Sequence, residues 1–243
     1  MRRRETADLA GSVGLGAWAA FAVLGLFVAG SGAPPAVDSG LLSWSVAHRP
    51  VVAVAAARGL TATGTGVVPY ALVALAGLLL GRTPRQRVLA AGLGAACLAA
   101  GQALRYGVME LAGRPRPPRQ DWATHASGWA FPSGHTTTSA LAAGLVIAAV
   151  CLRAPRGRTA FCLVAGGWAV LVGLTRVYLG VHWFTDVAGG WLFALGWLGA
   201  CLGAAARWLP SRLVAGLGPA SGAPVEKGTP PDPGDGPGRA PRT

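Results

Sequence analysis

Charged residues are scarce in this chain, and their scarcity sets the first limit on what it can be. Of its 243 residues, 12% are charged and 52% are hydrophobic, whereas soluble domains carry about 25% charged residues. Apolar runs long enough to cross a bilayer, about 17 to 25 residues each, recur along the chain. The composition therefore excludes a soluble two-domain enzyme and predicts an integral membrane protein.

Cysteine and lysine are also rare. The four cysteines lie in or at the ends of apolar runs, with no CxxC spacing and no histidine nearby. Such cysteines behave as small buried hydrophobic residues, so we expect neither a disulfide framework nor a zinc site. Lys227 is the only lysine, so the net charge of +12 comes almost entirely from arginine. The arginines lie between apolar runs rather than on one helix face, which argues against nucleic-acid binding.

Six apolar segments predict an all-α fold with six transmembrane helices. They cover residues 10–30, 65–81, 88–111, 136–152, 159–175 and 184–206. Residues 40–62 carry three basic side chains and predict one interfacial helix. Near the end of the chain prolines and glycines accumulate, and such a segment cannot bury a core. We therefore expect a membrane domain over residues 1–208 and a disordered cytoplasmic tail over residues 209–243.

The loops between these segments differ in their arginine content. Arginines cluster before the first segment, between the second and third, between the fourth and fifth, and after the sixth. The positive-inside rule assigns these loops, and with them both termini, to the cytoplasm. Residues 31–64, 112–135 and 176–183 then face the extracytoplasmic side, and the last two ranges contain nearly every residue capable of chemistry.

Three short motifs lie at this predicted extracytoplasmic surface. They are Arg114-Pro115-Arg116-Pro117, Pro132-Ser133-Gly134-His135, and Arg176, His182 and Asp186 in the spacing R-x5-H-x3-D. Arginine offers a planar fork of donors to phosphate oxygens. Ser133 and Gly134 stand at the start of a predicted helix, where free N–H groups favour an anion. The motifs together indicate a phosphate site.

Two histidines supply a nucleophile and an acid. His182 and Asp186 are four residues apart, so on a helix they share a face and can form a hydrogen bond. A carboxylate on one imidazole nitrogen fixes the tautomer and makes the other nitrogen a better nucleophile. His135 can then protonate a departing oxygen, and the set suffices for phosphoryl transfer without a metal.

These motifs resemble those of the type 2 phosphatidic acid phosphatase (PAP2) superfamily, which also includes the vanadium haloperoxidases and bacterial acid phosphatases. The family pattern is K-x6-R-P, P-S-G-H and S-R-x5-H-x3-D. The second motif matches in full, and Thr175 replaces the serine of the third. The resemblance covers about residues 10–206 and implies a PAP2-like helical bundle in the membrane.

The resemblance also implies a role for each motif residue. It assigns the nucleophile that forms a phosphohistidine to His182, the orienting carboxylate to Asp186 and the acid to His135. From the residues themselves we expect neither a cofactor nor a metal. The residues that the resemblance assigns to the phosphate oxygens are Arg116, Ser133, Gly134 and Arg176.

The first motif departs from the family pattern, because Met109 stands where the lysine is expected. Arg105 lies four residues earlier, one helical turn away on the same face, and its longer side chain can reach the phosphate in place of the lysine. An equally good interpretation gives Arg105 a structural role, either in a salt bridge to Glu110 or in a tie to a neighbouring helix. We include Arg105 among the predicted phosphate-binding residues.

The sequence thus predicts a multi-pass lipid phosphatase with an extracytoplasmic active site, whose partners are a lipid phosphate and the bilayer. Polyprenyl (di)phosphates, phosphatidylglycerophosphate and phosphatidic acid are the substrates considered. The alternatives are a non-catalytic protein that binds or flips a lipid phosphate and, ranked lower, a vanadate-dependent haloperoxidase. The sequence leaves open the identity of the lipid, the oligomeric state, and the roles of Glu110, Asp121 and His125.

Overall fold

The structure, a computed structural model, describes residues 3–153 and 156–208. The described residues form helices and loops without a β-strand, which confirms the predicted all-α fold. The tail predicted over residues 209–243 lies outside them. The helices are α1 (Arg3–Gly30), α2 (Ala36–Ala47), α3 (Val51–Ala62), α4 (Val67–Leu80), α5 (Pro84–Ala112), the short 3₁₀ helix η1 (Arg119–Asp121), α6 (Gly134–Arg153), α7 (Arg158–Tyr178) and α8 (Phe184–Trp208).

Five long helices and one bent pair correspond to the six predicted spans. Helices α1, α5, α6, α7 and α8 are each long and apolar enough to cross a bilayer. Helix α4 has 14 residues and rises only about 21 Å, less than the roughly 30 Å hydrocarbon core. Taken together with α3, from which it is bent by 50°, it forms the sixth candidate span. The chain is a multi-pass membrane protein.

The single interfacial helix predicted over residues 40–62 is wrong. This stretch is divided between α2, which ends at Ala47, and α3, which begins at Val51. Pro50 is the N-cap of α3 and has an extended backbone conformation. Proline has no N–H group and disfavours helical geometry in the residue before it, so Pro50 ends one helix and starts the next.

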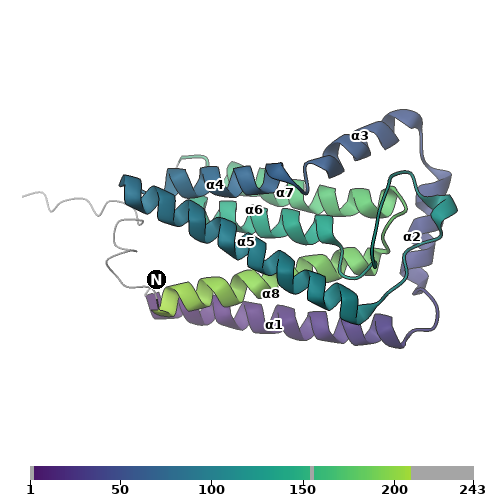
Figure 1. The fold of residues 1–243 in the computed structure, drawn as a ribbon, viewed down its shortest axis with the longest axis horizontal. Helices are drawn as coiled ribbons and strands as arrows, with labels where there is room; N and C mark the ends of the chain where they lie inside the picture. The colour runs from purple at the N-terminus through teal and green to yellow at the C-terminus, as the bar shows by residue number, and fades with distance from the viewer. Residues whose placement is uncertain (1–2, 154–155, 209–243) are drawn as a thin grey trace, which may run out of the picture.

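Figure 1 shows an elongated helical bundle in which α1 runs beside α8 along its length. Helix α2 lies across one end of the bundle, next to the loop that contains η1. The N-terminal end of α1, the turn between α4 and α5, the end of α6 and the start of α7 lie at the opposite end. The described arginines of the turn between α4 and α5, the end of α6 and the start of α7 are thus separated from the three motifs by the length of the bundle.

Small residues allow α8 to approach the start of α6, where the PSGH motif lies. A Cβ atom added to Gly190 would lie 2.9 Å from Cβ of Thr136 and 3.1 Å from the carbonyl oxygen of Ser133. Such distances leave no room for a side chain, so glycine is required for this close helix contact. The contact brings the second and third motifs together.

Candidate active site

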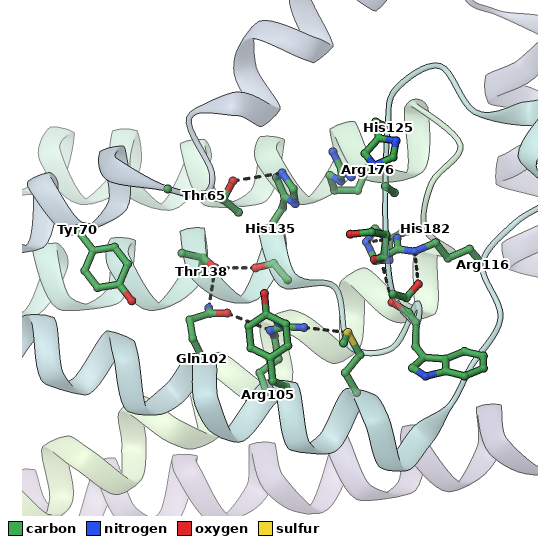
Figure 2. Close-up of a pocket in the computed structure, with 18 residues that line it drawn as sticks. Thr65, Tyr70, Gln102, Arg105, Arg116, His125, His135, Thr138, Arg176 and His182 are labelled. Atoms are coloured by element: carbon green, nitrogen blue, oxygen red, sulfur yellow. Dashed lines mark hydrogen bonds between the residues drawn. The ribbon is translucent and has the colours of Figure 1, made fainter.

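A cavity of about 570 Å³ opens where the three motifs meet (Figure 2). Helices α4 to α7 and the loops before α4, α6 and α8 form its wall. The structure therefore brings together residues that are far apart in the sequence. The predicted site residues that line the cavity are Arg105, Arg116, Gly134, His135, Arg176 and His182.

His182 lies in the loop between α7 and α8, with one ring nitrogen directed at a carboxylate. Its Nδ1 is 3.4 Å from Oδ2 of Asp186, which is fully buried in the first turn of α8. The same oxygen accepts a hydrogen bond of 2.8 Å from the backbone N–H of Trp183. The structure thus brings His182 and Asp186 together, although His182 precedes α8 and does not lie on a common helix with Asp186 as the i, i+4 spacing suggested.

The other ring nitrogen of His182 faces Arg116. Nη1 of Arg116 lies 2.9 Å from Nε2 of His182, and a guanidinium can only donate. Nε2 is therefore the acceptor and Nδ1 carries the proton that points to Asp186. Burial, together with the positive charges of Arg116 and Arg176, holds the pKa of His182 well below its usual range, so its ring is neutral and Nε2 keeps its lone pair.

Arg116 uses all its donor groups in this arrangement. Its five N–H groups are directed at the carbonyl oxygens of Ser127, Gly128, Trp129 and Val181 and at Nε2 of His182. Four of these bonds fix the backbone of residues 127–129 beside the cavity and connect it to the α7–α8 loop. Of these five N–H groups, only the one directed at His182 can bind a phosphate oxygen without the loss of a contact to the backbone.

The start of α6 presents the second motif to the cavity. His135 lies in the first turn of this helix, with Nε2 3.4 Å from Oγ1 of Thr65, and both side chains line the cavity. Gly134 also lines it. Free backbone N–H groups at a helix start attract an anion, and this start points at the same space as His135.

Ser133 occupies a different place from the one predicted. It is fully buried and does not line the cavity. Its hydroxyl accepts a hydrogen bond of 3.0 Å from Thr136, and its backbone N–H donates to the carbonyl oxygen of Asp186 at 3.0 Å. In this conformation Ser133 connects α6 to α8 and stands behind the surface that a phosphate would touch.

Arg176, in the last turn of α7, is a buried cation with donor groups to spare. It is 2% exposed, its Nη1 donates to Oγ1 of Thr61 at 3.1 Å, and its Nε has no partner. A buried guanidinium without a carboxylate is costly unless an anion compensates it. The geometry thus agrees with a phosphate position beside Arg176.

Arg105 reaches the same cavity from α5. It is 3% exposed, and its Nε donates to Oε1 of Gln102 at 3.0 Å. Its Cζ would lie 3.4 Å from a Cβ atom added to Gly134, so the guanidinium faces the start of α6. The alternative salt bridge to Glu110 does not form: the Glu110 side chain is exposed and no ion pair joins it to Arg105.

Two buried residues beside the third motif, Arg114 and Asp38, were assigned no role from the sequence. Arg114, the first arginine of the RPRP segment, donates to Oδ1 of Asp186 at 2.5 Å and to Oδ2 of Asp38 at 2.8 Å. Both carboxylates are buried. The available signal was that Asp38 is the only charged residue of α2.

The residues whose roles were left open lie at the margin of the site. His125 lines the cavity. Asp121 ends η1, and its carbonyl oxygen accepts a hydrogen bond of 2.6 Å from Arg49. Of the tryptophans near the motifs, Trp129 lines the cavity and Trp183 donates to the carbonyl oxygen of Pro115 at 3.0 Å.

The charge of the cavity has one sign. Three guanidinium groups line it and no aspartate or glutamate does. Among the residues that the structure describes, no three His, Cys, Asp or Glu side chains gather closely enough to hold a metal ion. The lining therefore favours an anion with several oxygens, next to an imidazole nitrogen that carries a lone pair.

The fold and the cavity thus define a multi-pass membrane protein with a cationic, histidine-containing site. The family model of the PAP2 superfamily matches residues 88–209, half of the chain, and the chain belongs to this superfamily. Its structure is similar to that of a transmembrane PAP2-type phosphatidylglycerolphosphate phosphatase from Bacillus subtilis, with a TM-score of 0.69 and 25% identity over 78% of this chain and 94% of that one. A search of curated proteins gives no significant match. The fold is that of a PAP2 membrane phosphatase.

Proposed function

We propose that the protein hydrolyses a phosphomonoester or diphosphate of a lipid through a phosphohistidine on His182. One observation carries this proposal: Nε2 of His182 faces the cationic cavity beside Arg116, while Nδ1 points to Asp186. A neutral imidazole held in this tautomer is a nucleophile aimed at the place where the guanidinium groups favour a phosphoryl group.

Two displacements at phosphorus account for the reaction. In the first, Nε2 of His182 forms a bond to phosphorus, the bond from phosphorus to the leaving oxygen breaks, and His135 gives its proton to that oxygen. In the second, water attacks phosphorus, His135 takes a proton from the water, and the bond to Nε2 breaks. Phosphate is released and both histidines return to their starting state.

The phosphoryl oxygens are held mainly by positive charge. Arg105, Arg116 and Arg176 surround the cavity from α5, the α5–α6 loop and α7. The backbone N–H groups at Gly134 add the start of α6. Charge that spreads over these oxygens in the transition state is stabilised by donors already in place, while Ser133 supports the backbone from behind.

The cavity continues onto an apolar surface, which favours a lipid as substrate. A groove along the start of α4 shares Gly66 and Tyr70 with the cavity and is otherwise lined by Val67, Ala71 and Ala74. A phosphate in the cationic cavity can therefore keep its hydrocarbon chain against α4 and the bilayer. Polyprenyl (di)phosphate, phosphatidylglycerophosphate and phosphatidic acid all fit this description.

We further propose that the active site faces the extracytoplasmic side, with both termini in the cytoplasm. The support is the separation seen along the bundle: the arginine-rich turns beside α5 and α7 lie at the end opposite the cavity. Positive loops are retained in the cytoplasm.

Phosphate release by the purified protein in detergent tests the proposed reaction. We expect release from at least one of the three lipid classes, activity that survives EDTA, and an acid-labile phosphoenzyme. His182→Ala should abolish both release and phosphoenzyme, whereas His48→Ala, which changes an exposed histidine at the end of α2, should retain both. An activity lost in EDTA and restored by magnesium would contradict the proposal.

Met109 supports a second candidate, a protein that binds or flips a lipid phosphate without turnover. This buried residue, 7% exposed, stands where the family pattern has a lysine. Saturable binding of a lipid phosphate to the wild type, with no phosphate release and no phosphoenzyme, would favour this function over the phosphatase.

A further inference from the structure

A buried charged network lies behind His182, and it begins on a helix outside the three motifs. Asp38, in the first turn of α2, is 1% exposed. Its Oδ2 accepts hydrogen bonds from Nη2 of Arg114 at 2.8 Å and from Oγ1 of Thr185 at 2.6 Å. Its Oδ1 accepts one from the backbone N–H of Thr185 at 2.9 Å. Asp38 therefore contacts the residue next to Asp186 and the arginine that Asp186 binds.

Arg114 lies between two carboxylates. One end of its guanidinium binds Asp38, and Nη1 at the other end donates to Oδ1 of Asp186 at 2.5 Å and to Oγ1 of Thr185 at 2.7 Å. The guanidinium is planar and rigid, so a contact that fixes one end also fixes the other. Asp38 thus determines where Arg114 meets Asp186.

This arrangement divides the two oxygens of Asp186 between two tasks. Oδ1 is bound to Arg114, and Oδ2 is left to His182 and the backbone N–H of Trp183. If Arg114 were free to shift, it could bind both oxygens of Asp186 at once, as arginine does with an isolated carboxylate. Asp186 would then have less capacity to accept the proton on Nδ1 of His182.

The network also has an unequal number of charges, with two carboxylates to one guanidinium. Arg114 alone would neutralise Asp186. Because Asp38 shares Arg114, this one guanidinium cannot neutralise both carboxylates, and Asp186 keeps part of its negative charge on the side of His182. Attack of Nε2 on phosphorus makes the imidazole ring positive, and negative charge in a buried environment stabilises it strongly.

We propose that Asp38 is a positioning residue for the phosphohistidine chemistry, acting through Arg114 on the orientation and charge of Asp186. This inference rests on the proposed function of His182. It extends the catalytic machinery to α2, a helix that crosses the end of the bundle and carries none of the three motifs (Figure 1).

A purely structural role for Asp38, tying α2 to the start of α8, makes a different prediction. Losing a structural tie lowers the fraction of molecules that fold, whereas losing a positioning residue slows each folded molecule. A burst experiment separates the two, because the amplitude of phosphoenzyme formation counts active sites and its rate constant reports chemistry at each site.

Asp38→Asn is the informative substitution, since it removes the charge and keeps the shape. We expect kcat and the rate constant of the burst to fall about 10- to 100-fold, by analogy with the loss of a partner that orients a metal ligand. Burst amplitude and KM should stay within about twofold, because Asp38 does not line the cavity. Asp38→Glu should restore part of the rate, and Asp121→Asn, the same change outside the network, should match the wild type.

The pH profile provides a second readout. Removing a negative charge disfavours the protonated imidazole, so the acid limb of kcat/KM should move to lower pH in Asp38→Asn. A structural tie has no reason to move it. The ionisable groups that face His182 from the surrounding elements are Arg105 on α5, Arg116 in the α5–α6 loop, His135 on α6, Arg176 on α7 and Asp186 on α8, and none of them is changed by this substitution.

Besides wild-type behaviour of Asp38→Asn, two outcomes would overturn the inference. One is a burst amplitude that falls while its rate constant is unchanged; the other is a slower rate with an acid limb that does not move. His182→Ala, run in the same assay, keeps these failures separate from the proposed function. If His182→Ala still forms a phosphoenzyme, the proposed function is wrong, and if it forms none while Asp38→Asn behaves as the wild type, only the role of Asp38 is wrong.

Discussion

Arg105 donates a hydrogen bond from Nη1 to the sulfur of Met109, one turn further along α5, at 3.4 Å. The guanidinium therefore extends along the helix toward the position where the PAP2 pattern has lysine. Gln102 accepts from Nε on the other side, and the ring of Tyr106 lies 3.9 Å from Cζ. These contacts hold the charge at the cavity wall without a carboxylate.

If Arg105 fills the role of the lysine, Met109→Lys alone should change turnover little. Arg105→Ala should lose about 2 kcal/mol or more of transition-state stabilisation, on the scale of a removed charged donor. Adding Met109→Lys to Arg105→Ala should then restore activity, because the new ammonium group would take the vacated place. Values of kcat/KM for the four proteins of this double-mutant cycle provide the measurement.

The opposite pattern would exclude the substitution of lysine by Arg105. It consists of a rise of tenfold or more in Met109→Lys alone, with unchanged turnover in Arg105→Ala. Arg105→Lys provides the matched control, because it keeps the positive charge but shortens the fork that reaches past Met109.

The hydrogen bond from Arg116 to His182 makes a prediction about pH. Burial and the charges of Arg116 and Arg176 lower the pKa of His182, so Nε2 stays unprotonated below the ordinary histidine value of about 6.5. In Arg116→Gln one positive charge is removed, protonation becomes easier, and the acid limb of kcat/KM should move to higher pH. Arg116→Lys retains the charge and should leave the limb near its original position.

Ionisation of the substrate is the same for all three proteins, so the difference between their profiles isolates His182. Lower activity is expected in both variants, since Arg116 also holds the carbonyl groups of residues 127–129. An acid limb that stays in place in Arg116→Gln would mean that it does not report His182.

The helices and the three motifs were accessible from the sequence because their signals are local. Long apolar runs predict spans, and the spacing of His182 and Asp186 predicts their contact. The division of residues 40–62 was missed although Pro50 marks it, because apolar character continues on both sides. The 50° bend between α3 and α4, which together form the sixth candidate span, depends on how the two helices pack, and hydropathy carries no information about it.

The network behind the site could not be predicted, because its members are paired only by the fold. Asp38 and Arg114 are 76 residues apart. In the sequence alone, Asp38 is typical of the first turn of a helix, and Arg114 is typical of a basic residue near lipid headgroups. The burial of Ser133 could not be predicted either, because it also depends on the fold. Its place behind the cavity follows from the close approach of α8 at Gly190.

The orientation of the bundle predicts which cysteines can be labelled from outside intact cells. In a background without the four native cysteines, Gln120→Cys should react with a membrane-impermeant maleimide, and Arg85→Cys should react only after the membrane is permeabilised. Both positions are exposed, and they lie at opposite ends of the bundle. The reverse pattern would place the cavity in the cytoplasm and exclude an extracytoplasmic substrate.

The loss of kcat in His135→Ala should be larger for substrates whose leaving group needs a proton. Its ring faces the cavity from the first turn of α6, with Nε2 beside Thr65. His135→Ala should lower kcat by about 10²- to 10⁴-fold for a lipid alcohol, the range for a lost general acid. The loss should be smaller for p-nitrophenyl phosphate, whose leaving group departs without protonation, whereas His182→Ala should be inactive toward both. Equal losses of His135→Ala on the two substrates would instead assign His135 to phosphate binding, because binding a phosphoryl group does not depend on the leaving group's need for a proton.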